Sequence, residues 1–292
     1  MSPLTTPAPR AERPPVQRVV EVVGCRPVDA YVELTLAAPE IAERAQPGQF
    51  VAFAVGGETS ALLLRRSIAI STADDGLVTV VVSAAGPGSA WLTERRPGDT
   101  VDVVGPLGRP FPPAPPGARA LLVGGGYGAA ALVGLAALLK AAGHAVDAVA
   151  GAAAADRLCS VQELTGIADT VAVTTDDGSS GRQGLVTLAV DELLPDIGVV
   201  YACGPMPMLR AVADAATARG IPSYVAVEES MACGIGVCMT CVLPAVGDDG
   251  RTRMVRSCVE GPVFLGDRVR WDDVGTVPPD TVGALTAPGA HR

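Results

Sequence analysis

Four of the seven cysteines in this chain of 292 residues fall between positions 233 and 258. Their spacing is Cys-x4-Cys-x2-Cys, followed by a gap of sixteen residues before the fourth cysteine. This is the plant-type ligand spacing of a 2Fe–2S cluster, and thiolates are soft ligands that suit iron. In a chain with this pattern, one loop supplies three of the ligands and a residue more distant in the sequence supplies the fourth. The pattern predicts an iron–sulfur site whose ligands are Cys233, Cys238, Cys241 and Cys258.

Two other uses of these cysteines stay open at this point. A structural zinc site also takes four cysteines, but its usual form has two Cys-x2-Cys pairs separated by about 15 to 20 residues. A disulfide framework suits a small secreted domain, whereas this chain is long and has an odd number of cysteines. The remaining three, Cys25, Cys159 and Cys203, are scattered and are typical of small packed apolar residues.

Charge and hydropathy exclude some classes of function. The net charge of -9 and the pI near 4.8 argue against a nucleic-acid partner, because a phosphate backbone is bound by a basic surface. Residues 1–15 are rich in proline and polar residues and predict a disordered leader, not a signal peptide. Residues 120–139 carry no charge and are long enough for a membrane span, but their glycines indicate a strand, a tight turn and a buried helix. We therefore expect no membrane association and a cytoplasmic protein.

The first folded region predicts a small antiparallel barrel. It contains short segments rich in apolar and β-branched residues, separated by turn signals such as Pro47-Gly48 and Pro97-Gly98. The expected strands are residues 18–25, 30–36, 49–55, 67–71, 77–83 and 99–104. A glycine-rich turn at residues 86–89 leads into a short helix whose N-terminus can hold a phosphate, and the guanidinium of Arg65 or Arg66 can pair with a pyrophosphate.

The pattern changes after a proline-rich linker at residues 110–116. Strands are expected at residues 118–123, 145–151, 170–174 and 199–203, and helices at 129–142, 159–165, 185–194 and 207–219. Alternation of strands and helices predicts a doubly wound parallel sheet that binds ligands at the carboxyl ends of its strands. The glycine run that follows the first of these strands is not the full Gly-x-Gly-x-x-Gly motif, so close helix-to-strand packing explains it equally well.

These segments together resemble the ferredoxin-NADP reductase superfamily and, within it, the electron-transfer subunits of type 1B dihydroorotate dehydrogenases. The resemblance covers roughly residues 16–267. It rests on Arg66 to Ala69, Gly86 to Ser89, Gly105 to Gly108, Gly124 to Gly128 and Cys203 to Met206. Its most specific part is Glu228 to Cys238 together with Cys258 to Phe264, because a cluster loop after the nucleotide-binding domain is unusual among flavin reductases.

The resemblance implies a domain order and a set of cofactor contacts. The expected segments are a disordered leader (1–15), an FAD-binding barrel (16–113), an NAD-binding domain (117–222), a small 2Fe–2S domain (223–268) and a C-terminal tail (269–292). The implied FAD contacts are Arg66, Ser67, Ile68, Ala69, Val81, Val82, Ser83, Gly88 and Ser89. The implied NAD contacts are Gly124, Gly125, Gly126, Gly128, Cys203, Gly204 and Pro205.

Two positions depart from the family pattern. Ala69 stands where the family usually has a serine near the reactive edge of the flavin, and Ala131 stands where the nucleotide loop often has a proline. The first departure bears on the flavin chemistry and the second on the nicotinamide site. Arg157, which follows the second strand of the nucleotide domain, leaves the choice between NAD and NADP open.

The function implied by the resemblance is that of an oxidoreductase subunit with no catalytic side chains beyond its cofactors. A partner catalytic subunit carrying FMN is expected to oxidise dihydroorotate to orotate in de novo pyrimidine (UMP) biosynthesis. This chain is expected to pass the electrons through the cluster and FAD to NAD+, within a heterotetramer of two copies of each chain. One alternative is the flavin subunit of an NAD(P)H:ferredoxin or sulfide-type oxidoreductase, which shares nearly all these motifs. Another is a non-catalytic assembly subunit.

Overall fold

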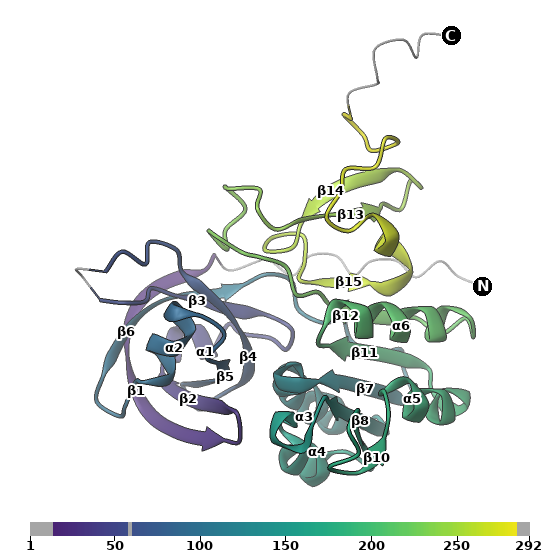
Figure 1. Cartoon of the computed structure of the whole chain (residues 1–292), viewed down its shortest axis with the longest axis horizontal. Coiled ribbons are helices and arrows are strands. Elements are labelled where there is room, and N and C mark those ends of the chain that lie inside the picture. Colours follow the sequence, from purple (N-terminus) through teal and green to yellow (C-terminus); the bar gives the residue numbers. More distant parts are fainter. Residues whose placement is uncertain (1–13, 58–59, 285–292) are drawn as a thin grey trace.

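The computed structural model describes residues 14–57 and 60–284. The predicted disordered leader therefore lies almost wholly outside the described residues, as does the end of the predicted tail at 285–292. Figure 1 shows a barrel in purple and blue beside a sheet with helices in teal and green, and a yellow-green C-terminal segment next to both.

Six antiparallel strands close into a barrel in the order β1-β2-β5-β4-β3-β6, which confirms the predicted architecture. They are β1 (Val16–Val28), β2 (Tyr31–Ala37), β3 (Phe50–Phe53), β4 (Arg66–Asp74), β5 (Leu77–Ser83) and β6 (Thr100–Leu107). Alternate residues such as Leu34 and Val80 point into the barrel and are fully buried. β4 extends past the predicted end at residue 71, because a tight turn at Asp75 and Gly76, both with positive φ, joins it to β5. Two short helices complete this part, α1 (Pro39–Ala42) and α2 (Pro87–Thr93).

Seven strands form the second sheet, in the order β10-β9-β8-β7-β11-β12-β15. They are β7 (Ala120–Gly125), β8 (Val146–Ala152), β9 (Thr170–Thr175), β10 (Arg182–Gln183), β11 (Val199–Cys203), β12 (Ser223–Ala226) and β15 (Val263–Leu265). Neighbouring strands are parallel except β12 and β15, which pair antiparallel. The predicted parallel sheet is confirmed, and the strand order reverses direction between β7 and β11, where such sheets bind ligands.

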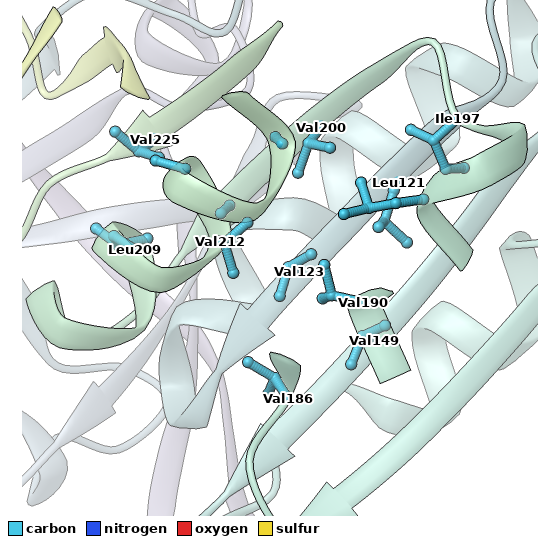
Figure 2. Close-up of a cluster of buried hydrophobic side chains, with 14 of the residues drawn as sticks. Leu121, Val123, Val149, Val186, Val190, Ile197, Val200, Leu209, Val212 and Val225 are labelled. Atoms are coloured by element: carbon cyan, nitrogen blue, oxygen red, sulfur yellow. The ribbon is translucent and has the colours of Figure 1, made fainter. Parts of the chain in front are cut away.

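Helices cover both faces of this sheet. They are α3 (Val133–Ala141), α4 (Val161–Ile167), α5 (Thr187–Leu193) and α6 (Met206–Thr217). Figure 2 shows one of the two cores, in which Leu121, Val123 and Val200 of the sheet face Val190 of α5 and Val212 of α6. Each such buried aliphatic side chain contributes about 1.5 to 3 kcal/mol relative to exposure. The helix expected at residues 129–142 begins as a 3-10 helix, η1 (Gly126–Leu132), before α3.

The proline-rich linker is fixed between the barrel and the sheet. Phe111 donates its backbone N–H to the carbonyl of Pro47 at 2.8 Å, and the hydroxyl of Tyr201 donates to the carbonyl of Pro112 at 3.0 Å. The rings of Phe111 and Tyr201 meet edge to face at 5.6 Å. The linker therefore packs against both neighbours and holds their relative orientation.

The cysteine-rich segment is an excursion between two neighbouring strands of the sheet. The chain leaves the sheet at the end of β12 and returns to it at β15, which pairs with β12 through Ala226 and Val263. Between them it forms a separate hairpin of β13 (Val242–Val246) and β14 (Thr252–Arg256). These strands are absent from the sequence prediction. β12 and β15 come from residues expected to belong to the cluster domain, but both are strands of the seven-stranded sheet. The cysteine-rich segment is therefore joined to the sheet at both of its ends.

No helix among the described residues is long and apolar enough to cross a membrane. Residues 120–139, the stretch without charge, fold into β7, η1 and most of α3. The strand, turn and buried helix predicted there are therefore confirmed.

Candidate cofactor site

A cavity of about 840 Å³ lies between the barrel and the carboxyl ends of the sheet strands. The barrel contributes residues of β4 and β5 and the first turn of α2, and the sheet contributes the ends of β7, β8 and β11 together with Asp176, which directly follows β9. Most of the predicted cofactor residues line this one space, namely Ser67, Ile68, Ala69, Val81, Ser83, Ser89, Gly125, Gly126, Gly128, Cys203, Gly204 and Pro205. The fold thus brings two predicted cofactor sets, far apart in sequence, to a single cavity.

Four predicted cofactor residues do not line the cavity. Val82 alternates with Val81 along β5, so its side chain is fully buried in the barrel core. A Cβ added at Gly124 would lie 2.5 Å from the Cβ of Ala129, so this glycine allows η1 to approach β7. Arg66 and Gly88 lie against each other at the rim, because a Cβ at Gly88 would be 2.5 Å from Arg66 Nε.

Arg66 lies against the first turn of α2, which contains Gly88 and Ser89. The guanidinium of Arg66 donates to the carbonyl of Leu64 at 2.6 Å and covers Gly88. Ser89, which is buried, accepts a hydrogen bond from the backbone N–H of Gly86 at 3.0 Å and so closes the first turn of α2. A guanidinium beside the N-terminal turn of a helix suits a pyrophosphate.

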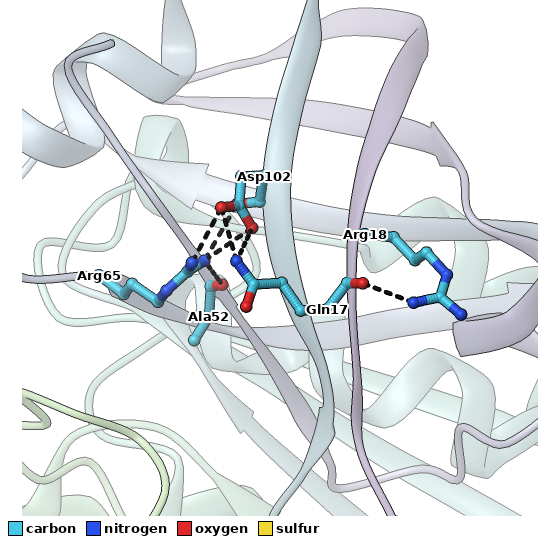
Figure 3. A network of polar contacts seen from close by, with 5 residues as sticks. All are labelled: Gln17, Arg18, Ala52, Arg65 and Asp102. Atoms are coloured by element: carbon cyan, nitrogen blue, oxygen red, sulfur yellow. Dashed lines mark hydrogen bonds and ion pairs between the residues drawn. The ribbon is translucent and has the colours of Figure 1, made fainter. Parts of the chain in front are cut away.

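Arg65 has a different role from its neighbour. Its guanidinium makes two hydrogen bonds to the carboxylate of Asp102, at 3.2 and 3.0 Å, and donates to the carbonyl of Ala52 at 3.2 Å. Gln17 donates to the same carboxylate at 2.8 Å. Figure 3 shows this network, which joins β1, β3 and β6 to the start of β4. Arg65 is therefore paired with a carboxylate inside the barrel, whereas Arg66 donates only to backbone carbonyls among the hydrogen bonds described and lies beside Gly88.

The glycine run after β7 serves both packing and the cavity. A Cβ at Gly128 would lie 2.6 Å from the carbonyl oxygen of Cys203, and one at Gly125 would lie 2.6 Å from Met208 Sδ. Gly126 has a φ of +54°, which favours glycine. Gly125, Gly126 and Gly128 also line the cavity. Close packing, the simpler explanation, is thus correct, and it places bare backbone on the cavity wall.

Tyr31, Tyr127, Glu228 and Glu229 also line the cavity and were not predicted from the sequence. Tyr31 from the barrel and Tyr127 from η1 meet edge to face at 5.8 Å, and the Tyr127 hydroxyl donates to the carboxylate of Glu228. Burial is the main cause that raises the pKa of Tyr127, ahead of its hydrogen bond to Glu228, and burial also raises the pKa of Glu229. Burial raises the pKa of Cys203 to about 12, which keeps this thiol protonated at neutral pH. The position of Tyr127 inside the glycine run is the one signal that could have revealed it.

Ala69 and Ala131, the two departures, both line the cavity. Ala69 is exposed on its barrel wall, whereas Ala131 is buried on η1. Arg157 lines the cavity as well, and its backbone carbonyl accepts a hydrogen bond from the Tyr31 hydroxyl at 3.0 Å.

The four predicted cluster ligands are arranged as two pairs. The Sγ of Cys233 accepts the backbone N–H groups of Val237 and Cys238, at 3.4 and 3.5 Å, so this thiol lies inside the loop. The hydroxyl of Thr240 donates to Cys238 Sγ at 3.1 Å and is the main cause that lowers the pKa of Cys238. Backbone N–H groups that point at a thiolate sulfur are the contacts that stabilise iron–sulfur ligands.

The second pair, Cys241 and Cys258, is buried against the barrel. Both side chains are 2% exposed and pack with Phe50, Ala52 and Leu107. Desolvation by this burial is the main cause that raises the pKa of Cys258. Cys238, by contrast, is exposed.

Among the described residues, no three His, Cys, Asp or Glu side chains converge on a single point as the ligands of one metal ion do. A 2Fe–2S cluster has two irons that share four protein ligands, so it suits thiolates arranged as two pairs. Glycines with positive φ at Gly234 (+70°) and Gly236 (+82°) shape the loop, as expected of a loop that turns its N–H groups inward. The backbone N–H groups that donate to Cys233 Sγ and the Cys-x4-Cys-x2-Cys spacing both fit a two-iron cluster.

One layer of side chains separates the cysteines from the cavity. A Cβ at Gly234 would lie 3.5 Å from Ser67 Oγ and 3.6 Å from Phe50 Cε2. Ser67, Phe50 and Met231 line the cavity, and Phe50 and Met231 also belong to the cluster of side chains around Cys241 and Cys258. The cluster loop therefore rests directly on the barrel wall of the cavity.

Known proteins match both parts of this site. The model of the iron-sulfur cluster binding domain of dihydroorotate dehydrogenase B matches residues 228–270. The electron transfer subunit of dihydroorotate dehydrogenase B (NAD(+)) from Bacillus caldolyticus is 42% identical over 241 residues, which cover 81% of this chain and 91% of that protein. A probable subunit of the same name from Methanopyrus kandleri is 37% identical over 249 residues, covering 84% of this chain and 88% of its own.

Solved structures of related folds also match. One is a chain from the structure of an NADH-dependent reduced ferredoxin-NADP oxidoreductase, described in connection with flavin-based electron bifurcation. It superposes with a TM-score of 0.77 and 32% identity, covering 88% of this chain and 91% of that one. The FAD/NAD binding domain of a nitric oxide dioxygenase from Vibrio cholerae superposes with a TM-score of 0.62 at 22% identity, covering 70% of this chain and 94% of its own, and this likeness extends to the fold alone.

Proposed function

The chain belongs to the family of dihydroorotate dehydrogenase B electron transfer subunits, and we propose that it delivers electrons from dihydroorotate oxidation on a partner subunit to NAD+. The family resemblance inferred from the sequence is confirmed. For this function the chain holds FAD and NAD in the cavity and a 2Fe–2S cluster on Cys233, Cys238, Cys241 and Cys258. A flavin supplies the exchange between a two-electron hydride transfer and one-electron steps.

The observation that carries this proposal is the contact between the cysteine loop and the cavity wall. A Cβ at Gly234 would lie 3.5 Å from Ser67 Oγ and 3.6 Å from Phe50 Cε2, and both residues line the cavity from the barrel side. Cys241 and Cys258 pack on the same wall and are shielded from water there. Phe50 and Met231 border both the cavity and the Cys241–Cys258 pair, so a flavin in the cavity and a cluster on the cysteines would lie on either side of these side chains.

The residues of the chain divide the work of binding. Arg66, with the turn at Gly88 and Ser89, neutralises a pyrophosphate at the rim of the cavity. The bare backbone of Gly125, Gly126 and Gly128 lets a dinucleotide approach the ends of β7 and β11. Tyr31 and Tyr127 form part of the opposite wall and would offer aromatic surface to a bound cofactor.

The partner is a catalytic subunit, as the relatives' designation as electron transfer subunits supports. We extend the proposal to a partner that carries FMN, to a heterotetramer with two copies of each chain, and to a cytoplasmic complex. A reducing compartment keeps cysteine thiols available as iron ligands, which supports that location.

A visible absorption spectrum of the anaerobically purified chain, recorded before and after NADH, tests the cofactors. Flavin bands and a broad cluster envelope that are both bleached by NADH are expected. A chain that stays colourless after reconstitution with iron, sulfide and FAD contradicts the proposal and favours zinc binding or a non-catalytic assembly role.

One structural neighbour favours a second candidate function, that of the flavin subunit of an NAD(P)H:ferredoxin-type oxidoreductase. The partner decides between the two. Dihydroorotate-dependent reduction of NAD+ by the chain mixed with a dihydroorotate dehydrogenase catalytic chain supports the first. NADH-dependent reduction of ferredoxin, without dihydroorotate activity, supports the second.

A further inference from the structure

Cys258, the cysteine most distant in sequence, sits inside a tight turn that Arg256 begins and Glu260 ends. The backbone N–H groups of Val259 and Glu260 donate to the carbonyl of Arg256 at 3.1 and 2.8 Å. The carboxylate of Glu260 accepts the backbone N–H of Arg256 at 2.7 Å. Ser257 donates its N–H to the carbonyl of Cys241 at 2.9 Å, which holds the turn beside its partner cysteine.

The side chain of Arg256 connects this turn to the loop with the other pair of cysteines. Its Nη1 donates to the carbonyl of Gly236 at 3.0 Å, across twenty residues of sequence. Its Nε and Nη2 point the other way, to the Glu260 carboxylate, with Nε at 3.0 Å from Oε2. The guanidinium is therefore held at both ends and joins the Cys258 turn to the stretch between Cys233 and Cys238.

The contact at Gly236 leaves no room for another residue. A Cβ there would lie 2.5 Å from Val259 Cγ2 and 3.2 Å from Arg256 Nη1, and the φ of +82° favours glycine. The close approach holds the positive guanidinium against the backbone between Cys233 and Cys238.

We propose that Arg256, oriented by Glu260, is a positioning residue that holds the two cysteine pairs in register for a two-iron cluster and raises the cluster's reduction potential. This inference rests on the proposed cluster. Outer contacts that orient metal ligands typically change metal affinity by about 10- to 100-fold when removed. A cation beside an anionic cluster favours its reduced form, since net charge and hydrogen bonds set iron–sulfur potentials.

The test compares Arg256→Gln, Arg256→Lys and Glu260→Gln in the full chain loaded with FAD and cluster. Arg253→Gln is the matched control, because Arg253 lies on the same strand and forms a similar ion pair with Asp249, at 2.7 Å, without reaching the cysteine loop. The rate of iron release to a chelator and the midpoint potential of the cluster are measured, with bound FAD per chain as the check that the rest of the molecule is folded.

Iron release at least about tenfold faster in Arg256→Gln, with FAD and the Arg253→Gln control unchanged, is expected. Arg256→Lys keeps the positive charge but loses the guanidinium that donates to both Glu260 and Gly236. Its cluster potential should therefore be closer to the wild-type value than its rate of iron release. Glu260→Gln should speed iron release and raise the potential, because it removes a negative charge and frees the guanidinium.

Wild-type release rates and potentials in Arg256→Gln overturn the inference. Loss of FAD together with iron in Arg256→Gln, combined with wild-type behaviour of Glu260→Gln, also overturns it, because the positioning role requires both partners. Failure of the wild-type chain itself to take up iron and sulfide is a different result, which contradicts the proposed cluster.

Discussion

The cavity is lined by residues at the ends of regular strands, whereas the four cysteines stand on a loop and a turn that are neither helix nor strand. Phe50 and Val81 on the cavity wall are less than a tenth exposed and belong to packed cores. Val237 on the cysteine loop is 76% exposed, and Ile235 is 53% exposed. The cavity therefore keeps its shape by packing, while the exposed half of the cysteine loop depends on bonds that its cofactor supplies.

This difference predicts that the two cofactors can be lost separately. Replacement of any one of the four cysteine ligands should reduce the iron and sulfide bound per chain. The flavin should be sensitive to changes of shape at the cavity rim.

The largest effect is expected from Cys241→Ser. Removal of one thiolate of four should abolish the cluster, while FAD binding is retained because the cavity is built from barrel and sheet strands. Iron, sulfide and flavin per chain measure both. Cys25→Ser, a change of the same kind on β1 where the thiol lies near Arg96, should leave all three unchanged. Loss of flavin together with iron would show that the cavity depends on the cluster.

Gly88→Ser should have the converse effect. The new side chain displaces the guanidinium of Arg66, which lies 2.5 Å from the Cβ position. Loss of a charge-assisted hydrogen bond of about 1.5 to 3 kcal/mol weakens FAD binding by about 10- to 100-fold, with the cluster intact. Gly86→Ser is the control, because nothing lies within 4 Å of its Cβ position and serine is a favoured N-cap residue. Equal flavin affinity in the two variants would refute the close contact.

The sheet beneath the cavity has its own polar anchor at its amino end. Asp147 accepts hydrogen bonds from Arg119 at 2.6 Å and from Thr170 at 2.6 Å, and the Arg119 hydrogen bond is the main cause that lowers the pKa of Asp147. A carboxyl whose pKa is lower in the folded state stabilises the fold above its unfolded pKa of about 3.9 and loses that stabilisation as pH falls through the folded pKa.

Asp147→Asn should therefore lower the free energy of unfolding at pH 7 by about 1 to 3 kcal/mol and flatten the fall of Tm below about pH 4. Thermal melts of both proteins between pH 3 and 7 measure this. Flavin affinity at pH 7 should not change, because Asp147 lies at the opposite end of β8 from the cavity. Parallel acid profiles for variant and wild type would contradict the role of the pair.

Adjacent arginines give a smaller and more selective contrast. Arg66→Lys keeps the charge at the rim but loses the fork, so FAD affinity should fall by about 1 kcal/mol, close to fivefold. Arg65→Lys should lower Tm without changing FAD affinity, because its partners Asp102 and Ala52 belong to the barrel (Figure 3). The opposite assignment of the two effects would mean that Arg65 faces the cofactor.

Ala69→Ser should have the smallest effect. It adds a hydroxyl to an exposed position on the cavity wall, so flavin affinity should change by less than about 0.5 kcal/mol. A new hydrogen bond at the reactive edge should accelerate flavin reduction by NADH about two- to tenfold. Stopped-flow absorbance at the flavin band measures the rate, and a rate equal to that of the wild type would show that Ala69 lies away from the reactive edge.

Much of this arrangement could be predicted from local sequence. The alternation of strands and helices predicted the parallel sheet, and the short strands with Pro-Gly turns predicted the barrel. The strands β12 to β15 were missed because they are short and are interrupted by the cysteine loop, so they lack a clear period. Tyr127 and Glu228 were missed as cavity residues because the hydrogen bond that brings them together joins positions about a hundred residues apart in the sequence.

The sequence by itself determined the kind of cofactor, because the Cys-x4-Cys-x2-Cys spacing is local and thiolates select their metal by chemistry. Only the tertiary structure decided which cysteines pair, that Cys241 and Cys258 are the buried pair, and that Arg66 lies against Gly88 whereas Arg65 pairs with Asp102. It also decided that Arg256 joins the two cysteine pairs. These features are contacts between residues distant in sequence, and such contacts are fixed by packing of whole elements, which no local pattern records.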